Sequence, residues 1–109
     1  MIPDELRTIK ARKLVSALKR DFFKEDRVKG DHHVFLRKLK DGTFRIVTVP
    51  YSNEGDEFAP GTLNQIFQAA GWTKRSDFVR VKLLRPRNTK ERARAILERE
   101  RLREQVIDP

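Results

Sequence analysis

Cysteine is absent from the 109-residue sequence, and histidine occurs only twice. The first absence excludes disulfides, thiol nucleophiles and thiolate metal sites. No HExxH or CxxC spacing accompanies the two histidines, so the sequence predicts no metal centre and no other cofactor. It also lacks a phosphate-binding glycine-rich loop, a dinucleotide fingerprint and a nucleophile elbow, which excludes the enzyme classes built on those motifs.

Long apolar segments are missing as well. No run approaches the roughly 18 apolar residues of a membrane span, and residues 1–12 contain no apolar stretch of signal-peptide length. We therefore expect a soluble, cytoplasmic protein with no membrane partner.

Charge, by contrast, is abundant. Lysine and arginine number 25 against 16 acidic residues, which gives a net charge of +9. Such a balance favours a polyanionic partner, most often nucleic acid, although a merely basic soluble surface is the alternative. The length fits one domain with a modest core.

The apolar spacing and the turn residues predict an α+β fold. Its order is a helix, three strands in an antiparallel meander, and one or two further helices. The expected helices are 3–20, 63–70 with Gly71 as its C-terminal cap, and a short one from Ser76 towards Leu83; the expected strands are 22–28, 32–38 and 44–49. Thr8 is an alternative start for the first helix. This α-β-β-β-α order is that of double-stranded RNA-binding-like folds, which by itself does not specify an activity.

Pro86 separates a charged tail from the rest of the chain. The sequence therefore predicts one folded domain over 1–84 and a helical extension over 85–109, with Asn88 or Thr89 capping a helix at 90–106. The apolar residues of this predicted C-terminal helix form only a thin stripe. The tail is then either a solvated appendage or an element that docks or forms a homo-oligomer.

The adjacent residues His32 and His33 are the candidates for catalysis. Because successive strand residues face opposite sides, at most one should point into a given site. Histidine is the natural general acid or base at neutral pH, although a lone histidine is more often structural. A base that removes the 2′-hydroxyl proton allows RNA cleavage without metal, while cations stabilise the phosphorane. The neighbouring Asp31 would either orient a histidine ring or simply complete the turn.

Five segments carry a resemblance to a known family. They are ARKLVSALKRDF at 11–22, KGDHHVF at 29–35, DG at 41–42 with IVTVP at 46–50, PGTL at 60–63 with AAGW at 69–72, and SDF at 76–78. In this order they resemble the HicA (YcfA-like) mRNA interferases of type II toxin–antitoxin systems.

The resemblance implies a double-stranded RNA-binding-like fold, cleavage of mRNA, and a HicB-like antitoxin protein that covers the active site. The family's catalytic histidine maps onto His32, and His33 is the second candidate. Residues predicted to bind RNA are the mapped Lys29 and Gly30 together with the nearest cations in sequence, Arg37, Lys38 and Arg45. Asp31 replaces the family's serine and favours the alternative of a non-catalytic RNA-binding module on the same fold.

Overall fold

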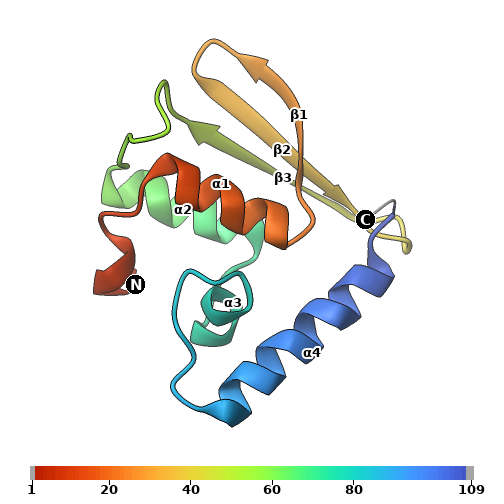
Figure 1. The fold of residues 1–109 in the computed structure, drawn as a ribbon. Coiled ribbons are helices and arrows are strands. Elements are labelled where there is room, and N and C mark those ends of the chain that lie inside the picture. Colours follow the sequence, from red (N-terminus) through yellow and green to blue (C-terminus); the bar gives the residue numbers. More distant parts are fainter. Residues whose placement is uncertain (1, 108–109) are drawn as a thin grey trace.

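Three antiparallel strands in the order β1-β2-β3 organise the computed structural model, which describes residues 2–107 (Figure 1). The strands are β1 (Lys24–Lys29), β2 (His32–Lys38) and β3 (Phe44–Pro50). Gly30 and Gly42 make the two tight turns with φ of 62° and 94°, a left-handed conformation that glycine adopts without steric cost. The α+β fold with an antiparallel meander is confirmed.

The sheet has one buried and one open face. Phe35 on β2 lies opposite Val47 on β3 and both are fully buried, whereas the next pair, Val34 and Thr48, points to the other side. This alternation follows from the two-residue period of a strand. It also fixes the orientation of every side chain near the start of β2.

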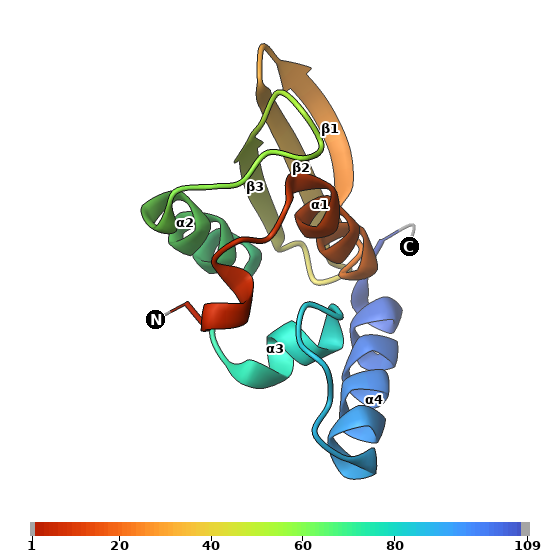
Figure 2. The ribbon, with the colours of Figure 1, turned by 60° about the vertical axis from the view of Figure 1, so that its left-hand side comes forward.

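Two helices cover the buried face, α1 (Ala11–Arg20) and α2 (Pro60–Ala70). Figures 1 and 2 show both helices on the same side of the sheet. Their apolar faces, at helical spacing, join the sheet residues in one core; the largest contributions from the helices are Leu14, Leu18, Leu63, Ile66 and Phe67. Gly71 ends α2 with φ of 82°, as expected for a C-terminal cap.

The N-terminal segment differs from the prediction of a single helix from Pro3. A short 3-10 helix, η1 (Asp4–Leu6), comes first, and α1 begins only at Ala11. The first N–H groups of α1, on Ala11 and Arg12, donate to the carbonyl oxygens of Asp56 and Glu54 at 2.8 and 2.9 Å. Because a distant loop satisfies these helix-start donors, the boundary carries no local sequence signal.

The first strand also starts later than expected. Phe22 has φ of 69°, and the N–H of Phe23 donates to the carbonyl oxygen of Leu18 at 3.0 Å. Both residues therefore belong to the turn that ends α1, and Phe23 is buried in the core.

The short third helix, α3 (Arg75–Arg80), is displaced from the range expected. Its start precedes Ser76 because the Asp77 carboxylate accepts from the N–H groups of Thr73 and Lys74 at 2.8 and 3.1 Å. It stops before Leu83 because Lys82 has φ of 64°.

The C-terminal helix α4 (Thr89–Gln105) is docked on the domain. The N–H of Lys40 donates to the carbonyl oxygen of Gln105 at 2.7 Å, and that of Ile107 donates to Lys38 at 3.0 Å. Val106 is 2% exposed. Figure 1 shows α4 running beside α3 and reaching the β2–β3 turn. As predicted, Asn88 caps the helix, its side chain accepting from the N–H of Glu91.

A buried carboxylate joins four parts of the fold. Asp21 at the end of α1 is fully buried and accepts hydrogen bonds from Trp72 Nε1 at 2.8 Å, Arg37 Nη1 at 3.1 Å and Arg80 Nε at 3.0 Å. Burial lowers the pKa of Arg37, although the charge of Asp21 opposes that shift. For Arg80, burial acts to lower the pKa, but hydrogen bonds and charges from Asp21 and Asp77 outweigh it and raise the pKa. Trp72 is thus a core residue, as its position after Gly71 predicts.

Candidate active site

The two histidines open β2 directly after the Gly30–Asp31 turn. In the sheet register His32 lies opposite Lys29 on β1, and His33 lies opposite Val28. Opposed residues share a face of the sheet, so His32 faces the open side with Lys29. His33 faces the side covered by the helices. The prediction that only one of the pair can serve a given site agrees with this geometry.

His32 is held by its neighbour and is exposed to solvent. Its Nδ1 lies 2.8 Å from Oδ1 of Asp31, and 60% of its side chain is accessible. A carboxylate that accepts a hydrogen bond from Nδ1 favours the tautomer in which Nε2 carries the free lone pair. The arrangement presents Nε2 as a base on the outside of the turn.

His33 is engaged on all sides. Its Nδ1 lies 3.0 Å from Oε1 of Glu25, its Nε2 lies 3.2 Å from the carbonyl oxygen of Tyr51, and its ring stacks on that of Tyr51 with centroids 3.8 Å apart. Only 18% of the side chain is accessible. Both ring nitrogens face acceptors, so His33 ties the loop after β3 to β1 and offers no free lone pair.

The partners of His33 were not among the residues predicted from sequence. Tyr51 stands in the loop after β3, and Glu25 is one of many charges on an exposed strand. Burial raises the pKa of Tyr51, and the negative charges of Glu25 and Glu54 add to the effect. The phenol therefore stays neutral beside the histidine ring.

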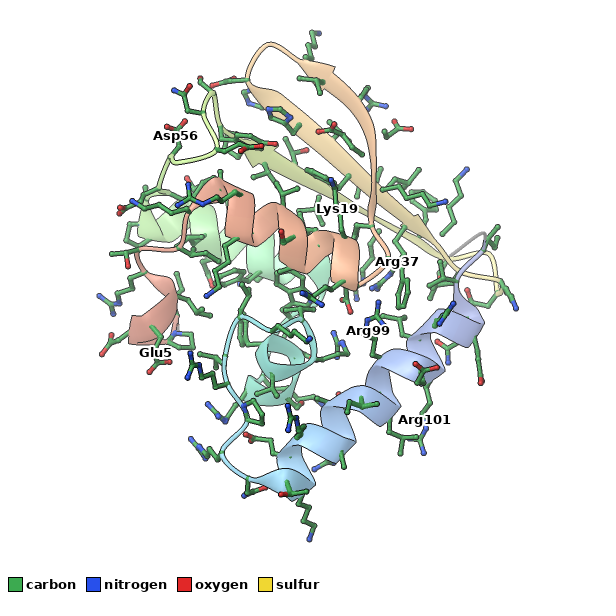
Figure 3. All side chains as sticks on the ribbon, in the orientation of Figure 1. Glu5, Lys19, Arg37, Asp56, Arg99 and Arg101 are labelled. Atoms are coloured by element: carbon green, nitrogen blue, oxygen red, sulfur yellow. The ribbon has the colours of Figure 1, made fainter. Side chains whose placement is uncertain are left out.

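The structure gathers some of the predicted RNA-binding residues around His32 and separates others. Lys29 and Gly30 form the turn beside it. Arg37 is 8% exposed and paired with Asp21, so its charge is used inside the fold. Figure 3 shows Arg37 between the sheet and the helices.

Lys38 and Arg45 lie towards the other end of the strands. Lys38 is six residues from His32 along β2, which at about 3.3 Å per residue places it ~20 Å away. Arg45 sits opposite Arg37, and its Nη1 lies 3.4 Å from the carbonyl oxygen of Ala69 at the end of α2. The candidate site therefore consists of His32, Asp31, Lys29 and Gly30.

Within residues 2–107 no group of three or more histidine, aspartate and glutamate side chains is arranged to hold a metal ion. In the same part of the chain, no helix combines the length and the apolar character needed to cross a bilayer.

The fold and the site together define a class of protein. Helices α1 and α2 on one face of a three-stranded antiparallel meander form a double-stranded RNA-binding-like α+β domain, and this one is strongly basic with an exposed histidine at a turn. A family model described as the HicA toxin of bacterial toxin-antitoxin matches residues 11–72, more than half of the chain. The chain therefore belongs to the HicA toxin family.

Membership defines the role in outline. The chain is the toxin component of a toxin–antitoxin system, and an antitoxin is its implied partner. The match confirms the family resemblance seen in the sequence, and helices α3 and α4 lie beyond the matched residues. No curated protein matches the chain.

Proposed function

We propose that this protein is an endoribonuclease toxin that cleaves mRNA without a metal ion, with His32 as its general base. The observation that carries the proposal is the geometry of His32, whose Nδ1 is held by Asp31 while Nε2 is exposed. Membership of a toxin family and the net charge of +9 support an RNA substrate.

The chemistry follows from the positions of these groups. His32 Nε2 removes the proton of a ribose 2′-hydroxyl, and the oxygen attacks the adjacent phosphorus in line. The bond from phosphorus to the 5′ oxygen breaks, that oxygen takes a proton, and a 2′,3′-cyclic phosphate remains. Lys29, opposite His32 in the register, stabilises the charge that develops on the phosphorane oxygens.

Asp31 acts in this scheme as a positioning residue. A carboxylate on Nδ1 orients the ring and stabilises the imidazolium formed when Nε2 is protonated. Its negative charge would also repel a phosphate, an effect that Lys29 on the neighbouring strand counteracts. Asp31 thus supports catalysis although the family pattern has serine at this position.

The antitoxin is proposed to be a HicB-like protein that covers His32. Because the turn around His32 is exposed and carries Lys29, an acidic surface on the antitoxin would complement it. Covering the turn would block access of RNA to Nε2.

Cleavage of a labelled mRNA by the purified protein in EDTA tests the proposal. We expect the wild type to cleave and His32→Ala to lose about 10²- to 10⁴-fold in rate, the usual contribution of a general base. Asp31→Asn should lower kcat, because it removes the carboxylate that orients the ring and stabilises the imidazolium. It should not weaken RNA binding, because it also removes a negative charge that repels phosphate.

His33→Ala is the matched control, since it removes the neighbouring ring but keeps Nε2 of His32. It should lower stability and retain cleavage. Loss of cleavage in His33→Ala alone would move the catalytic role to His33. Intact RNA with the wild type, together with salt-sensitive binding, would instead indicate a non-catalytic RNA-binding module.

A further inference from the structure

A groove lies between α4 and the segment that joins α3 to it, outside the residues that match the toxin family. Its volume is about 420 Å³, within the range of sites that bind small molecules. The residues that line it are Val79, Arg80, Lys82, Leu84, Arg85, Pro86, Arg92, Ala95, Ile96 and Arg99.

The charges that line this groove, hereafter the α3–α4 groove, are all positive. Arg80 is neutralised by Asp21 and Asp77. Arg99 donates to the carbonyl oxygen of Arg20 and lies over the ring of Phe22.

The three remaining cations of the groove are Lys82, Arg85 and Arg92. All three are exposed, and within residues 2–107 no ion pair or hydrogen bond engages their side chains. Elsewhere on α4, Glu91 pairs with Arg75 and Glu98 pairs with Arg80 and Arg94. The groove therefore presents three positive charges that have no carboxylate partner among residues 2–107.

Lys82 occupies a backbone position where glycine is the ordinary residue. Its φ is 64°, and the N–H groups of Leu83 and Leu84 both donate to the carbonyl oxygen of Phe78 at 2.9 and 3.2 Å, which fixes the turn. A residue with a Cβ is sterically disfavoured in this left-handed conformation. The fold thus holds a lysine at the groove rather than a glycine.

Apolar side chains also line the groove. Val79 and Leu84 are buried, whereas Ile96 from α4 is 58% exposed and Pro86 is also exposed. Apolar surface next to cations suits a nucleotide, because the base can contact the apolar side chains while the phosphates meet the cations.

We propose that the α3–α4 groove binds single-stranded RNA and extends the substrate surface of the protein beyond the matched domain. The inference rests on the proposed function only in naming RNA as the polyanion. An acidic protein segment would share the charge complementarity, but the repeating charge of a nucleic-acid backbone matches a groove whose charged lining residues are all cations.

The test is binding of a fluorescently labelled single-stranded RNA to the full chain carrying His32→Ala, so that cleavage does not intervene. The RNA should be about 20 nucleotides long. At about 3.4 Å per stacked nucleotide, the length of such a strand exceeds the longest extent of the molecule, 39 Å. The groove variant replaces Lys82, Arg85 and Arg92 with glutamine.

The matched control replaces Lys90, Arg101 and Arg103 with glutamine, which again removes one lysine and two arginines that are exposed. These residues are outside the groove lining. In Figure 3 Arg101 projects away from the domain, whereas Arg99 lies on the side facing α1. Circular dichroism of both variants confirms that the helices are retained.

We expect the groove variant to lose about 10- to 100-fold in affinity at 0.1 M salt. The slope of the logarithm of its binding constant against the logarithm of the salt concentration should become shallower by about 2, because three phosphate contacts to a single strand are lost. The control variant should lose less than threefold. Equal losses in both variants, or none in the groove variant, would overturn the proposal.

The two proposals fail separately. Cleavage is measured on the chain with His32 intact, and groove binding on the chain without it. Intact RNA in the first assay contradicts the catalytic proposal, whereas unchanged affinity of the groove variant in the second contradicts this one.

Discussion

At the scale of single residues, the side chain on which the fold depends most is Asp21. It is fully buried, and Arg37 and Arg80 both pair with it. Removing one partner of a buried ion pair leaves the other charges uncompensated. The Asp21 carboxylate therefore compensates the charges of two arginines inside the protein.

We expect Asp21→Asn to lower the free energy of unfolding by about 3–5 kcal/mol. Urea denaturation monitored by Trp72 fluorescence measures the change. Asp26→Asn is the control, because that carboxylate is exposed and forms a surface ion pair with Arg27; its effect should stay within about 0.5 kcal/mol. Equal stability of the two variants would show that the buried network contributes little.

His32 illustrates the opposite case. Its ring is hydrogen-bonded to Asp31, and most of its side chain is in solvent. The fold does not need this ring, whereas it uses the ring of His33 to connect Glu25 with Tyr51. Adjacent residues of one type thus have separate structural and chemical roles.

At the scale of elements, one carboxylate at the start of α4 links this helix to α3. Glu91 accepts hydrogen bonds from Arg75 Nε at 3.1 Å and from the N–H of Arg87 at 2.7 Å. The hydrogen bond from Arg75 is the main reason why the pKa of Glu91 is lowered from 4.5.

A carboxyl group with a depressed pKa in the folded state stabilises that state above its unfolded pKa, and the contribution is lost as the pH falls through the folded value. We therefore expect wild type to be more stable than Glu91→Gln at pH 6. The difference should shrink once the pH falls below about 4.5 and vanish below the lowered folded pKa. Urea denaturation at pH 6 and at strongly acidic pH measures it. Glu100→Gln, at an exposed position of the same helix, should show no such pH-dependent difference.

The elements that could be predicted from sequence are those with local signals. The alternation of residues 32–38 and 44–49, the Asp41-Gly42 turn and the Gly71 cap all lie within the segments they define. The start of α1 could not be predicted, because its donors are satisfied by the carbonyl groups of Glu54 and Asp56 from a distant loop. Buried Leu6 and Ile9 fit a helical period whether or not the helix is continuous.

Of the candidate site, only the features set by local sequence pattern could be predicted. Strand alternation was enough to place His32 and His33 on opposite faces. It could not show which face the helices cover, since apolar residues occur on both. Nor could it show that Arg37 meets Asp21, because that contact depends on how α1 packs on the sheet.

At the scale of the whole molecule, the tail and the matched domain share contacts. Val106 is buried beside Leu39, and Arg99 reaches the end of α1. The division into units 1–84 and 85–109 remains a prediction, but these contacts indicate that the two parts unfold together.

We expect one cooperative transition in which helical circular dichroism and Trp72 fluorescence change at the same denaturant concentration. Val106→Ala should shift both signals together by about 1–2 kcal/mol through lost burial. Loss of helical signal before the fluorescence change would show that 85–109 is a separate unit. Thr89→Ser, an exposed position at the start of α4, serves as the control and should shift neither signal.

The exposure of His32 has a consequence for inheritance. Because the ring contributes nothing to the core, a single base change in its codon would silence the proposed nuclease and leave a folded protein. Such a protein would still bind the antitoxin and, under the proposed function, RNA. It would compete for both with any active copy in the same cell. Escape from toxicity would therefore yield a persistent decoy rather than a degraded chain.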